Sequence, residues 1–337
     1  MSNSFRKLWL AAAFISLSGA VACGGSGQPN SASSSAATNS ASAANQPAFD
    51  TKTAETAPPA DQTGGFDGAK AYGNVAKLVS FGPRPPASDA LHRSQDYIIS
   101  ELKNEACEID QDDFHASTPK GDVVMKNIIG KAPGTGQGII LLLTHYDTLG
   151  SVENFVGAND SGSSTGLMLE MARQLCGKKG PNSVWIAFLD GEEAFVNWDQ
   201  DNDHTYGSRE LAARMVVSGD LKRVKAVILA DMIGQYNIAI PRDSNSTNWL
   251  TDLVWKTADH LGYKNIFVNR QNTTSDDHQP FTARGVAAVD IIDLNDYISA
   301  GYWHTPQDTL DKVSPRSLAI VGYVILESVA ELQKKFH

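Results

Sequence analysis

Cysteine is scarce in this chain of 337 residues, which has three in all. Cys23 lies near the start, and Cys107 and Cys176 are the two that follow it. These two do not lie in a CxxC or similar metal-type spacing, so we exclude cysteine from any metal site. An exported protein could pair Cys107 with Cys176, and two buried free thiols are the alternative that the spacing leaves open.

The chain also lacks an excess of positive charge. It has 28 lysines and arginines against 38 aspartates and glutamates, and its net charge is −10. Binding to phosphate backbones needs a basic face. The composition therefore argues against nucleic acid as a partner.

Long apolar runs are missing as well. The stretch Leu8–Ala22 is too short for a confident membrane span, and it follows Arg6 and Lys7, so residues 1–22 fit an export signal. The stretch ends in AVAC, which resembles a bacterial lipoprotein cleavage box that would leave Cys23 lipidated. An ordinary signal peptide is the alternative. We expect an exported lipoprotein, held to the membrane only by its N-terminal lipid and facing the periplasm or cell exterior.

The segment that follows, residues 23–64, is rich in serine and alanine and has almost no large apolar side chains. Such a segment cannot bury enough surface to offset its ordering entropy, so it predicts a disordered tether. No internal repeat is evident. Residues 65–337 are then one domain of ordinary size.

Within this domain, strand-like and helix-like patterns alternate. Continuous apolar runs in 138–147, 183–193 and 224–234 are typical of buried central strands. Amphipathic patterns in between predict helices, and Pro315 suits the first turn of a long closing helix. The alternation predicts an α/β fold with a largely parallel sheet covered on both faces.

Five possible metal ligands follow the apolar runs or lie in later loops. They are His145, Asp160, Glu193, Asp231 and His304. Imidazoles and carboxylates suit zinc in a catalytic site with an open position. Since the carboxyl ends of strands in an α/β sheet converge on one crevice, residues far apart in sequence can meet there.

Each of these motifs also has a plainer interpretation. His145 could be a surface histidine in a turn, or Asp147 could orient it from two residues away. Asp160 lies in a glycine-rich turn before a helix, where it could be a helix cap or a metal ligand.

The acidic run that ends in Glu192 and Glu193 is more specific, because clustered carboxylates repel one another unless a cation or proton is shared. We interpret Glu193 as a metal ligand and Glu192 as the group that transfers protons, with a solvated acidic loop as the alternative. Asp276 could cap a short helix or add a carboxylate to the site. Trp198 and Trp303 flank the ligands and suggest an apolar pocket wall.

At this point the chain resembles the zinc glutaminyl cyclases (glutaminyl-peptide cyclotransferases) of the peptidase M28, or zinc aminopeptidase, superfamily. The resemblance spans about residues 66–334. Its motifs include FGPRPPAS, HYD, FVGANDSG, FLDGEEAFVNW, YGSRELA, DDHQPF and YWHTPQDTLDKVSP. The cyclase-specific part is DGEEAF with Trp198 five residues after Glu193, together with Trp303 and His304, and the other motifs belong to the whole superfamily. It implies a three-layer α/β/α sandwich with a mixed, mostly parallel central sheet. It also implies that the substrates are peptide or protein N-termini beginning with glutamine. We expect the chain to be a monomer.

The resemblance implies a role for each site residue. Asp160, Glu193 and His304 would bind one zinc ion, and Glu192 would be the general base and acid. Asp231 and Asp276 would form a hydrogen-bonded carboxylate network, and Trp198 and Trp303 would line the substrate pocket.

The chain departs from the cyclases at three positions. Thr144 and Thr165 replace a cysteine pair that secreted cyclases often carry, and Ser275 replaces a glutamine. His145 and Asp231 are retained, so a second zinc is possible. The alternative functions are then an M28 aminopeptidase with two zinc ions and a binding module without catalysis.

Overall fold

The computed structural model describes residues 56–199 and 202–337. The predicted signal peptide, Cys23 and most of the predicted tether lie outside these described residues. The chain is already packed before residue 65, because a 3-10 turn spans Ala60–Gln62 and Thr63 is fully buried. The Thr63 hydroxyl donates a hydrogen bond to the Phe66 carbonyl at 2.6 Å. The predicted end of the tether at residue 64 is therefore several residues too late. Polar contacts hold this turn, and the low apolar content of the segment does not reveal them.

A six-stranded sheet forms the centre of the domain, with the strand order β1-β2-β4-β3-β5-β8. The strands are β1 (Glu108–Thr118), β2 (Gly121–Ala132), β3 (Ile139–His145), β4 (Ser183–Leu189), β5 (Val224–Asp231) and β8 (Ala288–Ile292). β2 is antiparallel to both β1 and β4, whereas β4, β3, β5 and β8 are parallel to one another. The mixed, mostly parallel sheet is as predicted.

Alternation along β3 shows how the sheet is covered on both faces. Ile140 and Leu142 belong to one apolar core, and Ile139, Leu141 and Leu143 belong to the other. Successive side chains of a strand point to opposite faces, so a fully apolar strand needs helices on both sides.

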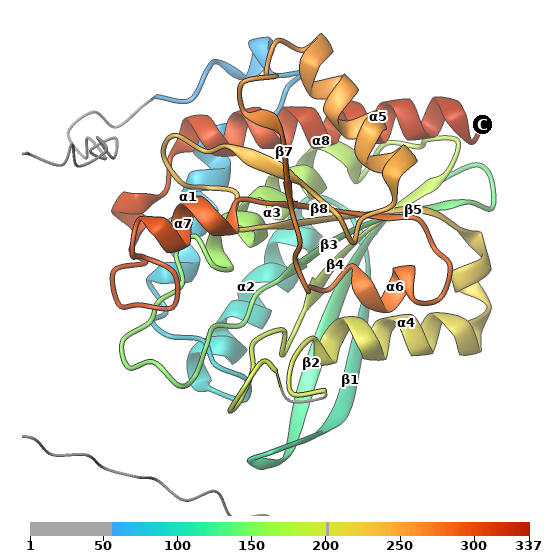
Figure 1. Ribbon diagram of the computed structural model, residues 1–337. Coiled ribbons are helices and arrows are strands. Elements are labelled where there is room, and N and C mark those ends of the chain that lie inside the picture. Colours follow the sequence, from blue (N-terminus) through green and yellow to red (C-terminus); the bar gives the residue numbers. More distant parts are fainter. Residues whose placement is uncertain (1–55, 200–201) are drawn as a thin grey trace, which may run out of the picture. The chain divides into compact units, whose positions relative to one another are not determined.

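Helices supply those two layers (Figure 1). One face is covered by α1 (Gly68–Val79), α2 (Asp89–Asn104), α3 (Gly162–Leu175), α5 (Asn248–His260) and α8 (Pro315–Lys335). The other face is covered by α4 (Tyr206–Ser218) and α6 (Gln279–Thr282). The result is the predicted three-layer α/β/α sandwich.

Capping residues explain where several helices begin. Asp67 accepts hydrogen bonds from the N–H groups of Ala69 and Lys70 at the start of α1. Ser88 caps α2, and Ser314 caps α8 immediately before Pro315. These side chains satisfy N–H groups that have no partner inside the helix.

Short elements complete the fold. β6 (Ile240–Asp243) and β7 (Phe267–Asn272) pair in parallel as a small second sheet, and α7 (Leu294–Ser299) follows β8. The 3-10 turns Asp220–Arg223 and Leu310–Lys312 lie in connections. β6 and α7 are too short for a periodic pattern to predict them.

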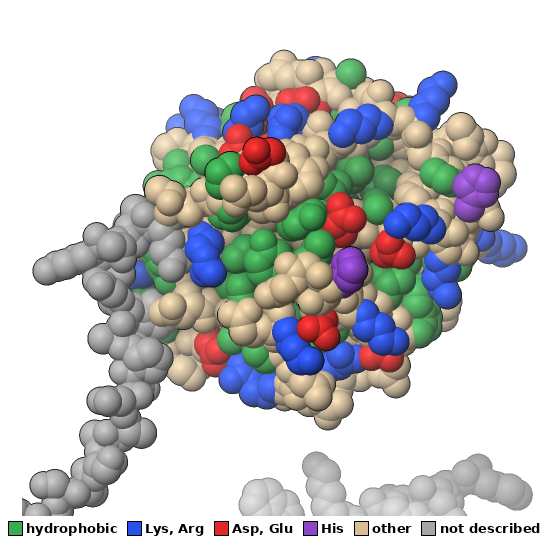
Figure 2. Space-filling model, turned by 90° about the horizontal axis from the view of Figure 1, so that it is seen from above, with side chains coloured by type: hydrophobic (Ala, Val, Ile, Leu, Met, Phe, Trp, Pro, Cys, Tyr) green, Lys and Arg blue, Asp and Glu red, His purple; other side chains and the backbone are tan. Residues whose placement is uncertain are grey.

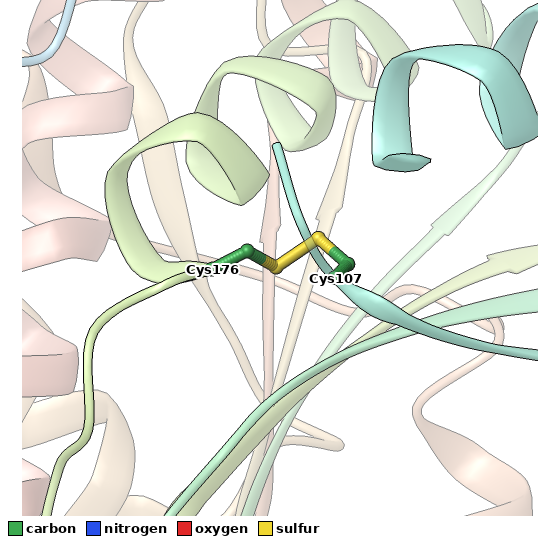
Figure 3. Close-up of a disulfide and its surroundings, with 2 residues drawn as sticks. All are labelled: Cys107 and Cys176. Atoms are coloured by element: carbon green, nitrogen blue, oxygen red, sulfur yellow. A yellow bond between two sulfur atoms is a disulfide. The ribbon is translucent and has the colours of Figure 1, made fainter. Parts of the chain in front are cut away.

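Cys107 and Cys176 form a disulfide, with a Cα–Cα distance of 5.0 Å. It joins the chain just before β1 to the end of α3 (Figure 3). Of the two possibilities that the sequence left open, pairing is the one observed.

Charged side chains of both signs lie on the surface (Figure 2). On the face shown in Figure 2, lysine and arginine side chains are scattered among acidic and apolar ones and do not form one basic surface. Among the residues that the structure describes, no helix has the length and apolar character needed to cross a membrane.

Candidate active site

The carboxyl ends of β3, β4 and β5 bring the predicted site residues together. His145 is the last residue of β3 and Asp231 the last of β5, and Glu192 and Glu193 lie three and four residues after the end of β4. All four are buried. Because the three strands are parallel, their ends meet at one edge of the sheet, as the sequence predicted.

Asp160, Glu193 and His304 form a group that fits one metal ion. His304 Nε2 lies 3.4 Å from Asp160 Oδ2 and 3.4 Å from Glu193 Oε2. Ligand atoms that surround one zinc tetrahedrally at about 2 Å lie roughly 3.4 Å from one another. Glu193 Oε1 is buried and accepts no hydrogen bond from the described residues. The donor set and its spacing therefore fit zinc with three protein ligands and one open position.

A second group shares Asp160 with the first. His145 Nε2 lies 3.3 Å from Asp160 Oδ1 and 3.1 Å from Asp231 Oδ1. The two oxygens of Asp160 thus face two different histidines. This arrangement is compatible with a second metal ion, which His145, Asp160 and Asp231 would hold, and equally with a direct hydrogen bond between His145 and Asp231.

Glu192 lies beside both groups and lines the cavity above them. Burial raises the pKa of its carboxyl well above the usual value, the charge of His145 lowers it, and the charge of Glu193 raises it further. A carboxyl group poised in this way can accept a proton and return it. A metal cation close by would favour the ionised form again.

Asp147 holds the two glutamates in place. Its carboxylate accepts hydrogen bonds from the backbone N–H groups of Glu192 at 3.1 Å and Glu193 at 3.2 Å. It also lies 3.5 Å from His145 Nδ1. Of the two interpretations of His145, the structure therefore shows a buried histidine beside Asp147 and not a surface histidine. The hydrogen bonds to the glutamate backbone were not predicted, because they join loops that follow different strands.

A cavity of about 500 Å³ opens over the ligands. Its lining includes Trp198 and Trp303, as predicted for an apolar wall. The Trp303 ring stacks on the His304 ring with centroids 3.9 Å apart. The Trp198 ring stacks in the same way on His204 at 4.1 Å. Both tryptophans therefore stand next to the position that a substrate would occupy.

Asp276 also lines this cavity and does not cap α6, so of its two interpretations the site carboxylate is the one observed. It accepts a hydrogen bond from the Asp277 N–H at 2.6 Å. Burial and the charge of Asp231 raise the pKa of its carboxyl well above the usual value. The side chain of Asp231 forms its hydrogen bond with His145 and not with Asp276. The two carboxylates that the resemblance places in one network therefore share the cavity without a direct hydrogen bond between them in the described residues.

Asp308 is a site residue for which the sequence suggested no role. Its carboxylate accepts hydrogen bonds from the N–H groups of Asn159 at 2.8 Å and Asp160 at 3.0 Å. The hydroxyl of Tyr297 donates a third hydrogen bond at 2.6 Å. Asp308 therefore fixes the turn that presents Asp160, and its position four residues after His304 is the one signal for it in the sequence.

Arg84, in the FGPRPPAS motif, supports the same turn from below. The fully buried guanidinium donates hydrogen bonds to the carbonyls of Tyr146 at 3.3 Å, Val156 at 2.8 Å and Gly157 at 3.1 Å. Gly157 has a φ of 52°, and a Cβ there would lie 1.9 Å from the Asp160 carbonyl oxygen. Only glycine allows the backbone to approach so closely.

A third cluster, Asp243, His278 and Asp290, lies outside the cavity. Asp243 is 3.3 Å from His278 Nε2, whereas Asp290 is 3.9 Å from His278 Nδ1. The carboxylates approach opposite nitrogens of the ring, while a single ion would use one nitrogen. We interpret the cluster as a buried imidazole that lies between two carboxylates. Asp243 accepts a hydrogen bond from the Thr274 N–H at 2.9 Å, which links the cluster to the loop carrying Asp276.

Comparison with known proteins places this site in a family. The model of Peptidase family M28 matches residues 127–329. The chain belongs to this family. It is similar to the crystal structure of an Acidobacteriales bacterium glutaminyl cyclase, with 38% identity, a TM-score of 0.75, and coverage of 80% of this chain and 96% of that one.

Other members of the family are similar over most of their length. The glutaminyl-peptide cyclotransferase of Bothrops jararaca is 29% identical over 293 residues, which are 74% of this chain and 78% of the relative. A Zn-dependent exopeptidase from Parabacteroides distasonis is 28% identical with a TM-score of 0.71, over 78% of this chain and 97% of that one. The resemblance to the glutaminyl cyclases of the M28 superfamily is confirmed.

Proposed function

We propose that this chain is a zinc-dependent glutaminyl-peptide cyclotransferase, which converts the N-terminal glutamine of a peptide or protein into pyroglutamate and releases ammonia. The observation that carries the proposal is the group of Asp160, Glu193 and His304 beneath a cavity walled by Trp198 and Trp303. The similarity to several glutaminyl cyclases supports it.

In this reaction the nucleophile is the substrate's own α-amine, so no water has to be activated. A bond forms between the amine nitrogen and the γ-carbonyl carbon, and the bond from that carbon to the amide nitrogen breaks. Zinc bound by Asp160, Glu193 and His304 would supply Lewis-acid polarisation of the γ-carbonyl oxygen. Glu192 takes the proton from the amine and returns it to the departing ammonia.

The remaining residues of the cavity bind and orient the substrate. Trp198 and Trp303 hold the glutamine side chain between apolar faces and exclude competing water. Asp231 and Asp276 offer carboxylate oxygens to the substrate's N–H groups. Much of the rate acceleration then comes from holding amine and carbonyl in attack geometry.

An aminopeptidase with two zinc ions is the alternative, because Asp160 faces both His145 and His304. Two substitutions separate the alternatives by bound zinc per chain. Glu193→Gln removes a ligand of the proposed single zinc, so bound zinc is lost. Asp231→Asn leaves that ion in place in a cyclase, whereas it removes one of two ions in an aminopeptidase.

The decisive experiment is mass spectrometry of a Gln-initiated peptide incubated with the zinc-loaded protein. A loss of about 17 Da (ammonia) that a chelator abolishes and zinc restores supports the proposal. Release of a free amino acid instead would make the chain an aminopeptidase.

We further propose that the protein is exported and attached to the membrane through lipid on Cys23, and that the domain acts as a monomer. The export signal and the AVAC sequence support the first part. Growth with a labelled fatty acid tests it, since an unlabelled protein contradicts it.

A further inference from the structure

One wall of the cavity is a short segment that follows the ligand Glu193 directly. We call residues 194–199 the wall segment. Val196, Asn197 and Trp198 of this segment line the cavity. The wall segment contains no proposed metal ligand and no proposed proton-transfer group. Because it lines the cavity, its position affects how the substrate side chain is bound.

The carboxylate of Asp203 holds this segment with hydrogen bonds. Its Oδ2 accepts the backbone N–H groups of Val196 at 2.8 Å and Asn197 at 3.0 Å. Its Oδ1 accepts the N–H of Phe195 at 3.2 Å and the hydroxyl of Tyr206 at 3.0 Å. Asp203 is itself buried. One carboxylate thus satisfies three consecutive N–H groups of the wall segment.

The next residue, His204, stacks on the tryptophan of the wall segment, Trp198. Its ring lies on the Trp198 ring with an interplanar angle of 10°. Burial and the charge of Arg209 lower the pKa of His204. The imidazole is therefore neutral near pH 7, and its uncharged aromatic face lies against the indole.

The residues after His204 connect this support to the catalytic loop. The N–H of Thr205 donates to the carbonyl of Glu192 at 2.8 Å, and the N–H of Tyr206 donates to the carbonyl of Gly191 at 2.8 Å. Asp203 and His204 are therefore held at a fixed position relative to the proposed general base, and through them so is Trp198.

We propose that Asp203 is a specificity-determining positioning residue, whose carboxylate fixes the wall segment so that Trp198 stands against the substrate side chain. The inference rests on the proposed cyclase function and deepens it. A carboxylate is required because both of its oxygens are acceptors. In asparagine, an NH₂ group would replace one of them and face N–H donors of the wall segment.

The test is Asp203→Asn in the zinc-loaded protein, with Asp259→Asn as a control at an exposed carboxylate on α5. We expect Asp203→Asn to raise KM for a Gln-initiated peptide about tenfold or more, because several hydrogen bonds to one charged group are weakened. We expect kcat to fall much less and bound zinc per chain to stay unchanged. In a Glu192→Gln background, calorimetry should show the same loss of peptide affinity without turnover.

A double-mutant cycle with Trp198→Ala shows whether Asp203 acts through the tryptophan. We expect Asp203→Asn to add little to the loss that Trp198→Ala causes alone. Additive losses, or an unchanged KM in the Asp203 variant, would overturn the inference and leave the proposed function standing. A wild-type protein that does not cyclise the peptide would refute both.

His204→Ala provides a second measurement if the Asp203 variant does not fold. It removes the ring beneath Trp198 and leaves the hydrogen bonds of Asp203 in place. We expect KM to rise in the same direction by a smaller factor, again without added effect in the Trp198→Ala background. A KM equal to that of the wild type would show that the stacking of His204 does not position Trp198, and would contradict the inference.

Discussion

Replacing Arg84 by methionine should both destabilise the fold and weaken the metal site, although Arg84 touches no substrate. Methionine occupies similar space but donates no hydrogen bonds. The carbonyls of Tyr146, Val156 and Gly157 would lose the donors that Arg84 provides. Hydrogen bonds to charged groups contribute about 1.5 kcal/mol or more each, so we expect the free energy of unfolding to fall by about 4 kcal/mol.

The same substitution removes a buried positive charge from beneath the site. Burial lowers the pKa of Arg84 to about 10, and the charges of Asp308, Asp147 and Asp160 oppose that change. The guanidinium therefore stays charged at neutral pH. Without it, the turn that presents Asp160 loses its support, and we expect zinc affinity to fall about tenfold to a hundredfold, as for other residues that orient a ligand.

Two assays check these magnitudes. Urea denaturation of the metal-free protein gives the change in stability, and competition with a chromophoric chelator gives the change in zinc affinity. Arg84→Lys is the matched control, because it keeps the charge but loses the planar fork of donors, and it should fall between the wild type and Arg84→Met. A methionine variant with wild-type stability and zinc affinity would refute the reasoning.

Three further predictions concern the proton-transfer group, the disulfide and a buried carboxyl group. Glu192→Gln should keep zinc bound while lowering turnover about a hundredfold or more, measured by ammonia release, and undiminished turnover would remove Glu192 from its role. Replacing Cys107 and Cys176 by serine opens a cross-link between residues 69 apart in sequence, and denaturation should show a loss of about 4 kcal/mol. Asp293→Asn should change the pH dependence of stability, since burial raises the pKa of Asp293 to about 7. The folded state then holds this proton more tightly than the unfolded state, so the contribution is present below about pH 4 and is lost as the pH rises towards 7. The stability of the variant relative to the wild type should therefore rise between about pH 4 and pH 7. Parallel stability curves for the two proteins over this range would contradict the prediction.

The central layers of the fold could be predicted because their signal is local. In β3, β4 and β5 the apolar runs are continuous, and each run ends in the polar residues of the site. Short elements such as β6, with four residues, have no room for a period, and β6 is held by its pairing with β7, which lies far from it in the sequence. The disulfide was left open for the same reason, since pairing depends on where β1 and α3 come together.

The candidate site divides along similar lines. Residues that would touch metal or substrate belong to distinctive motifs, so His145, Asp160, Glu193 and His304 could be named from the sequence. Residues that hold those groups in place are harder to predict, because an aspartate that accepts backbone N–H groups looks like any other aspartate. Asp147, Asp203 and Asp308 each hold a different loop in this way, and only the arrangement of those loops in space reveals it.

The electrostatics of the site connect these two classes of residue. Asp147, Asp160, Glu192, Glu193 and Asp231 are all buried at one edge of the sheet. Buried carboxylates are costly unless cations, protons or hydrogen-bond donors compensate them. Arg84 supplies one fixed positive charge from below, and backbone N–H groups supply partial charges to Asp147. The oxygens of Asp160 and Glu193 that face His304 remain, and a divalent cation between them would complete the compensation. The same acidic cluster that would make an empty site costly is thus what favours zinc binding there.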